Sequence, residues 1–195
     1  QALVTALSSP MAEGRLYEVD MRLRPSGRKG PVATPFSGFQ SYQQTEAWTW
    51  EHLALTRARV VAGPPDLAAE VEAFRRDLLA RPRDAAKTIA DVADMRARLA
   101  EAADRGRVAD PWETKLGPGR MLDIELLAQA AALLAGSALR DVAGQLAASD
   151  ALGWFTADER TTVLTAYATL GKVQQIGRLM VEGDLKPEDL GQDAR

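Results

Sequence analysis

The chain has 195 residues, 46% of them hydrophobic and 26% charged, which is an ordinary composition for a soluble globular protein. It has no cysteine, and this excludes a disulfide framework, a thiolate metal site and a cysteine nucleophile. The net charge of -3 and the short apolar runs argue against a nucleic-acid-binding face and against a membrane span. With no secretory signal visible, we expect a cytoplasmic piece of a longer protein.

The segment LYEVDMRLRPSG, at residues 16–27, has the alternating pattern of a strand. Side chains alternate between the two faces of a strand, so one face of residues 16–24 is apolar. The other face carries Glu18, Asp20, Arg22 and Arg24. Pro25 removes a backbone donor and ends the strand. Because one strand cannot form a sheet, we expect its partners upstream of the first residue or in another chain.

This charged face favours two interpretations. Carboxylates bind Mg²⁺ through oxygen and arginines bind phosphate through a fork of N–H groups, so the face could hold a metal and a phosphate chain. Residues 15–29 add a local excess, with five cations against two anions. The glycine-bracketed loop that follows could close over such an anion. The alternative is a solvated strand face with ion pairs between strands.

The remainder of the chain has helical spacing, which predicts a mainly helical fold. Gly63-Pro64-Pro65 ends one helix, and Thr156 with Glu159 forms a capping box that opens another. The helices that we expect are residues 1–8, 37–62, 66–80, one from Asp84 with the buried stripe Ile89, Val92, Met95 and Leu99, then 121–135, 138–148, and a long one with the stripe Val163, Tyr167, Leu170, Gly177 and Met180.

Two further clusters could carry chemistry. In QTEAWTWEHLALTRARVV, Trp48 and Trp50 are interpreted as aromatic anchors of a core helix, while Arg57 and Arg59 could contact a partner. The lone His52 is interpreted as a surface or hydrogen-bonded histidine rather than a base. In KLGPGRMLDIELLAQ, a carboxylate in the first helical turn stabilises the helix dipole, which is one interpretation of Asp123.

Glu125 lies on a helix that is apolar nearly all round, so it needs a partner or a water-filled cleft. Lys115 and Arg120 are the candidates for that partner.

These motifs in this order, LYEVDMRLRPSG, GPVAT, YQQTEAWTWEHLALTRARVV and LDIELLAQ, resemble the glutamine synthetase adenylyltransferase family over about residues 15–129. The segment EAWTWEH is similar to that of the C-terminal, adenylylating half of these enzymes. The resemblance implies the end of a polymerase-beta-type nucleotidyltransferase α/β domain at residues 1–62. It implies a helical bundle domain at residues 63–195.

The resemblance also implies roles for single residues. Asp20 matches a third metal-binding carboxylate and would bind Mg²⁺, and Arg22 and Arg24 would neutralise ATP phosphates. The remaining nucleotide-binding candidates are Glu18, Arg57, Arg59, Lys115, Asp123 and Glu125. The Gly-Ser and Asp-x-Asp motif of the family is absent from these residues, so we expect the fragment alone to be inactive. Gly119-Arg120 stands where the family usually has a glycine pair.

The implied activity is the transfer of AMP from ATP to a tyrosine of glutamine synthetase, which controls nitrogen assimilation. The implied partners are glutamine synthetase and the PII signalling protein, with glutamine as an effector. Two alternatives stay open. The helical part could be a binding module for glutamine synthetase or PII, or the chain could serve the deadenylylating, phosphorolytic half.

Overall fold

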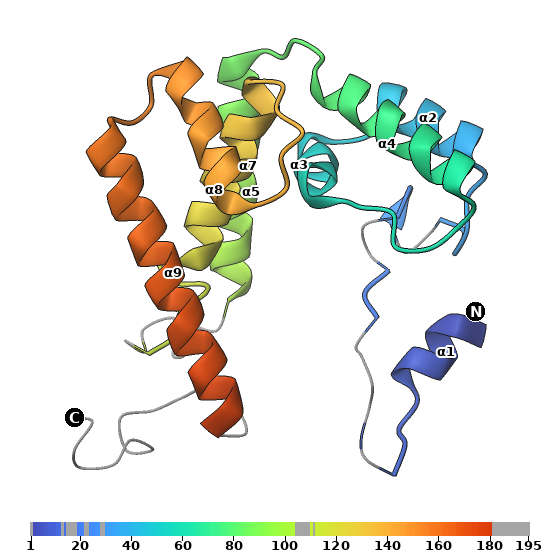
Figure 1. Cartoon of the computed structure of the whole chain (residues 1–195), viewed down its shortest axis with the longest axis horizontal. Coiled ribbons are helices and arrows are strands. Elements are labelled where there is room, and N and C mark those ends of the chain that lie inside the picture. The colour runs from blue at the N-terminus through green and yellow to red at the C-terminus, as the bar shows by residue number, and fades with distance from the viewer. Residues whose placement is uncertain are drawn as a thin grey trace.

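The computed structural model describes residues 2–12, 14, 19–21, 24–27, 30–103, 110 and 112–180. The elements in this part are α1 (Ala2–Ser8), α2 (Phe36–Thr45), α3 (Thr49–Arg57), α4 (Pro65–Leu79), α5 (Ala85–Ala102), α7 (Met121–Leu134), α8 (Val142–Ala147), the 3₁₀ helix η2 (Ala148–Leu152) and α9 (Ala157–Met180). Helices dominate, so the predicted mainly helical fold is confirmed (Figure 1). None of these helices is long and apolar enough to cross a bilayer within the described residues.

The predicted strand at residues 16–24 is wrong for the part that can be described. Residues 19–21 adopt neither strand nor helix, and Arg24 lies in a bend. A strand needs a neighbour for its backbone groups, and the described residues provide only the isolated bridge between Met11 and Gly14. Glu18 and Arg22 lie outside the described residues.

The single helix predicted over residues 37–62 is instead two helices, α2 and α3. The Glu46 amide closes α2 on the Tyr42 carbonyl, with a nitrogen–oxygen distance of 2.9 Å. A new helix then begins, because the Glu51 carboxylate accepts a hydrogen bond from the Trp48 amide at 2.9 Å. This bond satisfies a donor at a helix start, as a capping residue does.

Helices α4 and α5 begin near the predicted positions. Pro65 is the first residue of α4, and the Asp84 carboxylate caps α5 by accepting a hydrogen bond from the Lys87 amide at 2.9 Å. The predicted stripe on α5 is only half correct. Val92 and Met95 pack against the core, whereas Ile89 and Leu99 are exposed.

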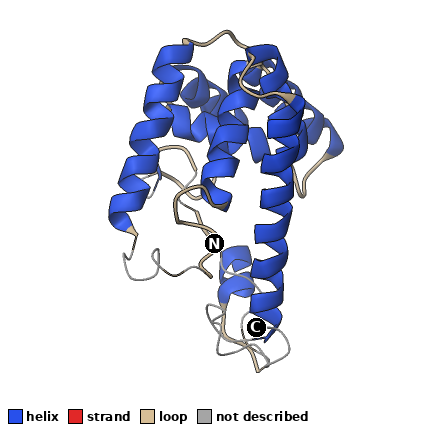
Figure 2. Ribbon diagram, turned by 90° about the vertical axis from the view of Figure 1, so that its left-hand side faces the viewer, coloured by secondary structure: helices blue, strands red, loops and turns tan. Residues whose placement is uncertain are grey.

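Helix α7 is the centre of the bundle and contacts α3, α5, α8 and α9 (Figure 1). Figure 2 shows the described elements as helices joined by loops. It is apolar nearly all round, and the prediction that it is buried is confirmed. On one side Leu126 and Leu133 pack with Leu53 of α3 and Leu79 of α4. Each such buried leucine contributes about 1.5–3 kcal/mol to the free energy of folding.

On the other side of α7 a second core joins α8 and α9. Leu146 of α8 packs with Ile124 and Ala128, and side chains from α9 cover them. The helix predicted at 138–148 is shorter, at 142–147, and continues as η2. The capping box is confirmed, since the Thr156 amide donates to Glu159 at 2.8 Å. Met180 is exposed, so the predicted stripe of α9 ends before it.

Candidate functional site

Asp20 is exposed and precedes a turn at Arg24 to Gly27, in which the Gly27 amide donates to the Arg24 carbonyl oxygen at 2.9 Å. The Arg24 guanidinium braces this turn, with Nη1 2.5 Å from the Met21 carbonyl oxygen and Nε 3.3 Å from the Gly30 carbonyl oxygen. A β-carbon at Gly30 would stand 2.0 Å from the Pro25 carbonyl oxygen, so only glycine fits there. Arg24 is the described cation nearest to Asp20 in the sequence. It therefore stabilises the turn that follows Asp20.

The turn is linked to the helical part through Tyr42 of α2 and Glu51 of α3. The Tyr42 hydroxyl donates to both Glu51 carboxylate oxygens, at 2.9 and 3.1 Å. Burial raises the pKa of Tyr42, and a hydrogen bond from the Ser26 backbone acts in the opposite direction. Ser26 itself has φ +59°, a left-handed conformation that side chains rarely adopt. The sequence analysis missed Glu51, although its position three residues after Trp48 matches a capping spacing.

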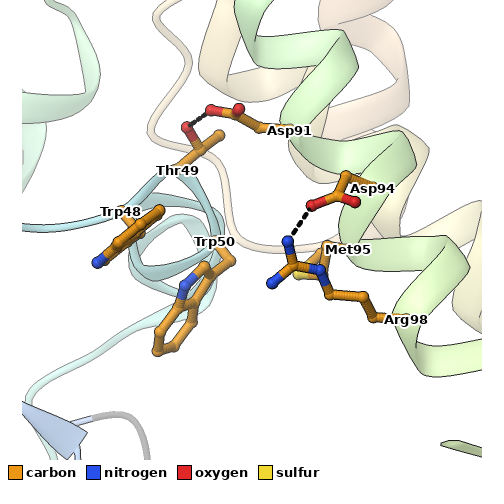
Figure 3. Close-up of a pocket in the computed structure, with 7 residues that line it drawn as sticks. All are labelled: Trp48, Thr49, Trp50, Asp91, Asp94, Met95 and Arg98. Atoms are coloured by element: carbon orange, nitrogen blue, oxygen red, sulfur yellow. Dashed lines mark hydrogen bonds and ion pairs between the residues drawn. The ribbon is translucent and has the colours of Figure 1, made fainter.

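The first turn of α3 and one face of α5 enclose a hollow of about 260 Å³. Trp48 and Trp50 are 69% and 37% exposed, so their interpretation as core anchors is wrong. The hollow is lined by Trp48, Thr49, Trp50, Asp91, Asp94, Met95 and Arg98 (Figure 3). The figure shows the indoles on one side and the Asp94–Arg98 ion pair on the other.

A second hollow of about 350 Å³ shares Trp48, Thr49 and Asp91 with the first. It extends to His52, whose Nε2 lies 2.9 Å from the Gln43 carbonyl oxygen and whose Nδ1 lies 2.9 Å from Nη1 of Arg83. Because a guanidinium can only donate, Nδ1 must accept, and the ring is neutral. Burial lowers the pKa of His52, and the Arg83 charge adds to this effect. The interpretation as a hydrogen-bonded histidine is confirmed.

Arg57 and Glu125 are two predicted site residues that the structure brings together. Nη1 of Arg57 is 3.3 Å from Oε2 of Glu125, and the Tyr167 hydroxyl donates to Oε1 at 2.9 Å. The partner of Glu125 is therefore Arg57 together with Tyr167, rather than Lys115 or Arg120. Burial and the neighbouring Glu125 raise the pKa of Tyr167 to about 12. This cluster joins α3, α7 and α9.

The loop before α7 is organised by Glu113, which the sequence analysis missed. Its buried carboxylate accepts hydrogen bonds from the amides of Lys115, Leu116 and Gly117, at 2.9, 2.7 and 3.1 Å. Arg120 adds an ion pair at 3.0 Å. Burial alone would raise the pKa of Glu113, but these donors outweigh it and the pKa is lowered. The loop is therefore held in one shape from within.

Asp123 also stabilises this loop. It accepts a hydrogen bond from the Gly119 amide at 2.7 Å and forms an ion pair with Arg96 of α5. Lys115 and Arg59, which are predicted to bind the nucleotide, are both exposed. Arg59 lines a small apolar hollow of about 100 Å³ beside Phe39 and Phe74.

The described residues contain no group of three carboxylate, histidine or cysteine side chains that could hold a metal ion. Magnesium needs near-octahedral oxygen coordination, and it is usually bound through one or two carboxylates together with substrate phosphates and water. Asp20 alone does not build that site.

Comparison with known proteins places these features in a family. The family model of glutamate-ammonia ligase adenylyltransferase matches residues 1–74. A protein of Rhizobium meliloti is 44% identical over 97% of this chain and 20% of its own length. One of Mesorhizobium japonicum is 43% identical over 97% of the chain and 19% of its own length. One of Brucella suis is 51% identical over 68% of the chain and 13% of its own length.

All three relatives carry the name bifunctional glutamine synthetase adenylyltransferase/adenylyl-removing enzyme. The chain spans about a fifth of the length of the first two of them.

Proposed function

The chain belongs to the glutamine synthetase adenylyltransferase family, and from this premise we propose that it forms part of a cytoplasmic enzyme that transfers AMP from ATP to a tyrosine of glutamine synthetase. The observation that carries the proposal is the family match over residues 1–74, which contain Asp20, its turn and the tryptophan helix. We propose residues 1–62 as the end of the nucleotidyltransferase domain and residues 63–195 as the helical domain. PII and glutamine would regulate the whole enzyme.

In this proposal Asp20 supplies one carboxylate of a magnesium site. The described residues do not build a complete site, and we propose that the other ligands come from the part of the enzyme beyond this chain. Arg22 and Glu18 flank Asp20 at alternate positions and would contact the nucleotide phosphates and their counterions. Arg24 would hold the turn through the Met21 and Gly30 carbonyls and keep its charge beside the phosphates. We therefore expect the chain by itself to be inactive.

The helical part would approach the nucleotide from the other side. Arg57, Arg59 and Lys115 are its proposed phosphate contacts, since cations stabilise the charge of a phosphate chain. Asp123 and Glu125 would act as positioning residues, because a carboxylate repels phosphate and both are already held by arginines. The adenylyl-removing activity in the relatives' name is the second candidate function. The EAWTWEH segment favours the adenylylating half.

The experiment measures the adenylylation of glutamine synthetase with ATP and Mg²⁺ by three proteins. They are this chain, the full-length enzyme and the full-length enzyme with Asp20→Asn. We expect activity only in the unmodified full-length enzyme. A control, Asp158→Asn, removes an exposed carboxylate from α9 and should leave activity unchanged. Full activity of Asp20→Asn would refute the assignment of Asp20.

A matched assay separates the second candidate. It supplies inorganic phosphate and adenylylated glutamine synthetase in place of ATP. If the full-length enzyme needs Asp20 for this phosphate-dependent reaction but not for adenylylation with ATP, the chain belongs to the adenylyl-removing half.

A further inference from the structure

Arginines from three parts of the chain meet at the end of α3. Arg75 of α4 donates to two carbonyls in the last turn of α3, at 2.7 and 2.6 Å. Nε of Arg140, in the segment before α8, donates to the Ala58 carbonyl at 2.7 Å. Arg59 follows Ala58 directly. The last carbonyls of a helix attract cations, so two of these arginines have a local structural reason to be here.

Glu72 of α4 is the carboxylate that these arginines share. Its Oε1 lies 2.9 Å from Nη1 of Arg75, and its Oε2 forms an ion pair with Arg140. Arg59 lines the small hollow of about 100 Å³ that Glu72 and Arg75 also line. Within the described part of the chain, Arg59 forms no ion pair. One carboxylate therefore serves two arginines, and a third arginine adjoins it.

The positive charge of this cluster exceeds its negative charge. Arg59, Arg75 and Arg140 bring three guanidinium groups, and Glu72 is the one described carboxylate that contacts any of them. Asp141, the next residue after Arg140, instead caps α8 by accepting an amide hydrogen bond at 2.7 Å. Two positive charges are left. This matches the charge of about -1.5 to -2 that a terminal phosphate group carries near pH 7.

Two of the three arginines are accessible to a ligand. Arg59 is exposed, and the side chain of Arg140 is 39% exposed. Arg140 uses Nε for Ala58 and Nη2 for Glu72, so the two N–H groups of Nη1 are available among the described contacts. Arg59 and Arg140 can therefore donate to the same anion from two sides of Ala58.

Arg75 contributes charge rather than contacts. It is 3% exposed, and carbonyl oxygens and Glu72 accept hydrogen bonds from its guanidinium. Burial lowers the pKa of Arg75, and the charge of Arg140 lowers it further, although Glu72 opposes both effects. Glu72 therefore does not cancel the repulsion between the two arginines. An anion bound at Arg140 would offset it.

We propose that Arg59 and Arg140 together bind one phosphate group at the end of α3. Guanidinium groups bind phosphate oxygens through a fork of N–H donors, whereas a single carboxylate would neutralise only one of the two charges. The inference rests on the proposed function, which assigns Arg59 to phosphate, and it adds Arg140 as the second arginine. Glu72 positions Arg140. The phosphate is either the terminal group of ATP or free inorganic phosphate, which the adenylyl-removing reaction would consume.

Binding is tested on this chain by titration with inorganic phosphate and with ATP, without Mg²⁺ and at constant ionic strength. The backbone amide NMR signals of Arg59 and Val60 give the Kd. We expect Arg59→Gln and Arg140→Gln each to raise the Kd about tenfold. Arg178→Gln removes an exposed cation from α9 and should leave the Kd unchanged. An equal Kd in all four proteins, or an equal loss in all three variants, overturns the proposal.

Arg59→Gln decides the question if Arg140→Gln does not fold. The side chain of Arg59 is exposed and forms no ion pair in the described part of the chain, so its loss should not affect folding. Thermal unfolding of each variant checks this.

Steady-state kinetics of the full-length enzyme identify the source of the phosphate. If the terminal phosphate of ATP binds here, Arg59→Gln and Arg140→Gln raise KM for ATP about tenfold in adenylylation. If free phosphate binds here, they raise KM for inorganic phosphate in removal of the adenylyl group. KM for glutamine synthetase should stay the same. A rise in KM for glutamine synthetase alone would assign the arginines to the protein substrate and overturn the proposal.

The two possible failures are distinguishable. If the proposed function is wrong, the unmodified full-length enzyme catalyses neither reaction. If only the phosphate site is wrong, that enzyme is active, and Arg59→Gln and Arg140→Gln change neither KM for ATP nor KM for inorganic phosphate.

Discussion

The hydroxyl of Tyr42 donates to the carboxylate of Glu51 at 2.9 Å, and Glu51 is only 3% exposed. The same carboxylate accepts the Trp48 amide that begins α3. The Ser26 backbone, in the turn after Asp20, forms a hydrogen bond with Tyr42. One buried carboxylate therefore ties the start of α3 to the turn that follows the proposed metal ligand.

Replacing Tyr42 with Phe should loosen this connection without leaving a cavity. The variant removes one donor from a buried carboxylate, and we expect a loss of about 1–3 kcal/mol in the free energy of unfolding. Urea denaturation measures the loss, and hydrogen exchange measures the opening of the Ser26 amide. Ser41→Ala, an exposed neighbour on α2, is the control. An unchanged exchange rate at Ser26 would show that Tyr42 does not hold the turn.

Arg75 of α4 is a buried arginine that ties three segments together. It is 3% exposed and donates to the carbonyls of Leu55, Thr56 and Ala138, at 2.7, 2.6 and 2.9 Å, as well as to Glu72. Arg75→Ala should destabilise the protein by about 3–5 kcal/mol, because these carbonyls and Glu72 lose their donor. The matched control is Arg76→Ala, which removes an exposed arginine from the same helix. Equal unfolding midpoints of the two variants would contradict this role.

Sequence patterns predict a helix end well when the residues that form it are close together in the sequence. Pro65 at the start of α4, the Asp84 cap of α5 and the box of Thr156 with Glu159 act within a few residues, so spacing reveals them. The break between α2 and α3 contains no glycine or proline. It depends on hydrogen bonds to Glu51, and a helical spacing of apolar residues conceals it.

The candidate site was less predictable because its contacts are distant in sequence. Glu125 meets Tyr167 across 42 residues, and a pattern on one helix cannot identify that partner. No sequence pattern marks Arg75 as buried, because charged residues on amphipathic helices usually face solvent. Trp48 and Trp50 are an exception of the opposite kind. Aromatic residues at helical spacing usually indicate a core, but these two are exposed. Roles for Asp20, Arg57 and Lys115 stay predictions.

The pH dependence of stability should contain a contribution from His52. Burial first, and then the charge of Arg83, lowers the pKa of this ring, while the Gln43 carbonyl opposes the shift. An unfolded histidine titrates near 6.5. The unfolded chain therefore binds a proton before the folded one does, so this contribution is fully present above about pH 6.5 and is lost as the pH falls below it.

Urea unfolding between about pH 5.5 and pH 7.5 checks the sign, with His52→Gln as the comparison. The variant should be less stable at neutral pH and should lose less stability on acidification. If the free energy of unfolding falls equally with pH in the unmodified protein and in His52→Gln, then His52 is not the source of the pH dependence.

The last prediction concerns Glu113, the carboxylate inside the loop before α7. Burial would raise its pKa, but the amides of Leu116, Lys115 and Gly117 and the Arg120 side chain lower it. An unfolded glutamate titrates near 4.3. The stabilisation by Glu113 is therefore present above about pH 4.3 and is lost as the pH falls through the lower folded pKa.

Glu113→Gln keeps the size of the side chain but places an amide donor among backbone donors. We expect a loss of about 2–4 kcal/mol at neutral pH, measured by urea unfolding. Glu101→Gln, on the exposed surface of α5, is the control and should change stability little. Hydrogen exchange should quicken at the amides of Leu116 and Gly117. If the free energy of unfolding falls while exchange at these two amides stays slow, the loop is held by Arg120 and Asp123 rather than by Glu113.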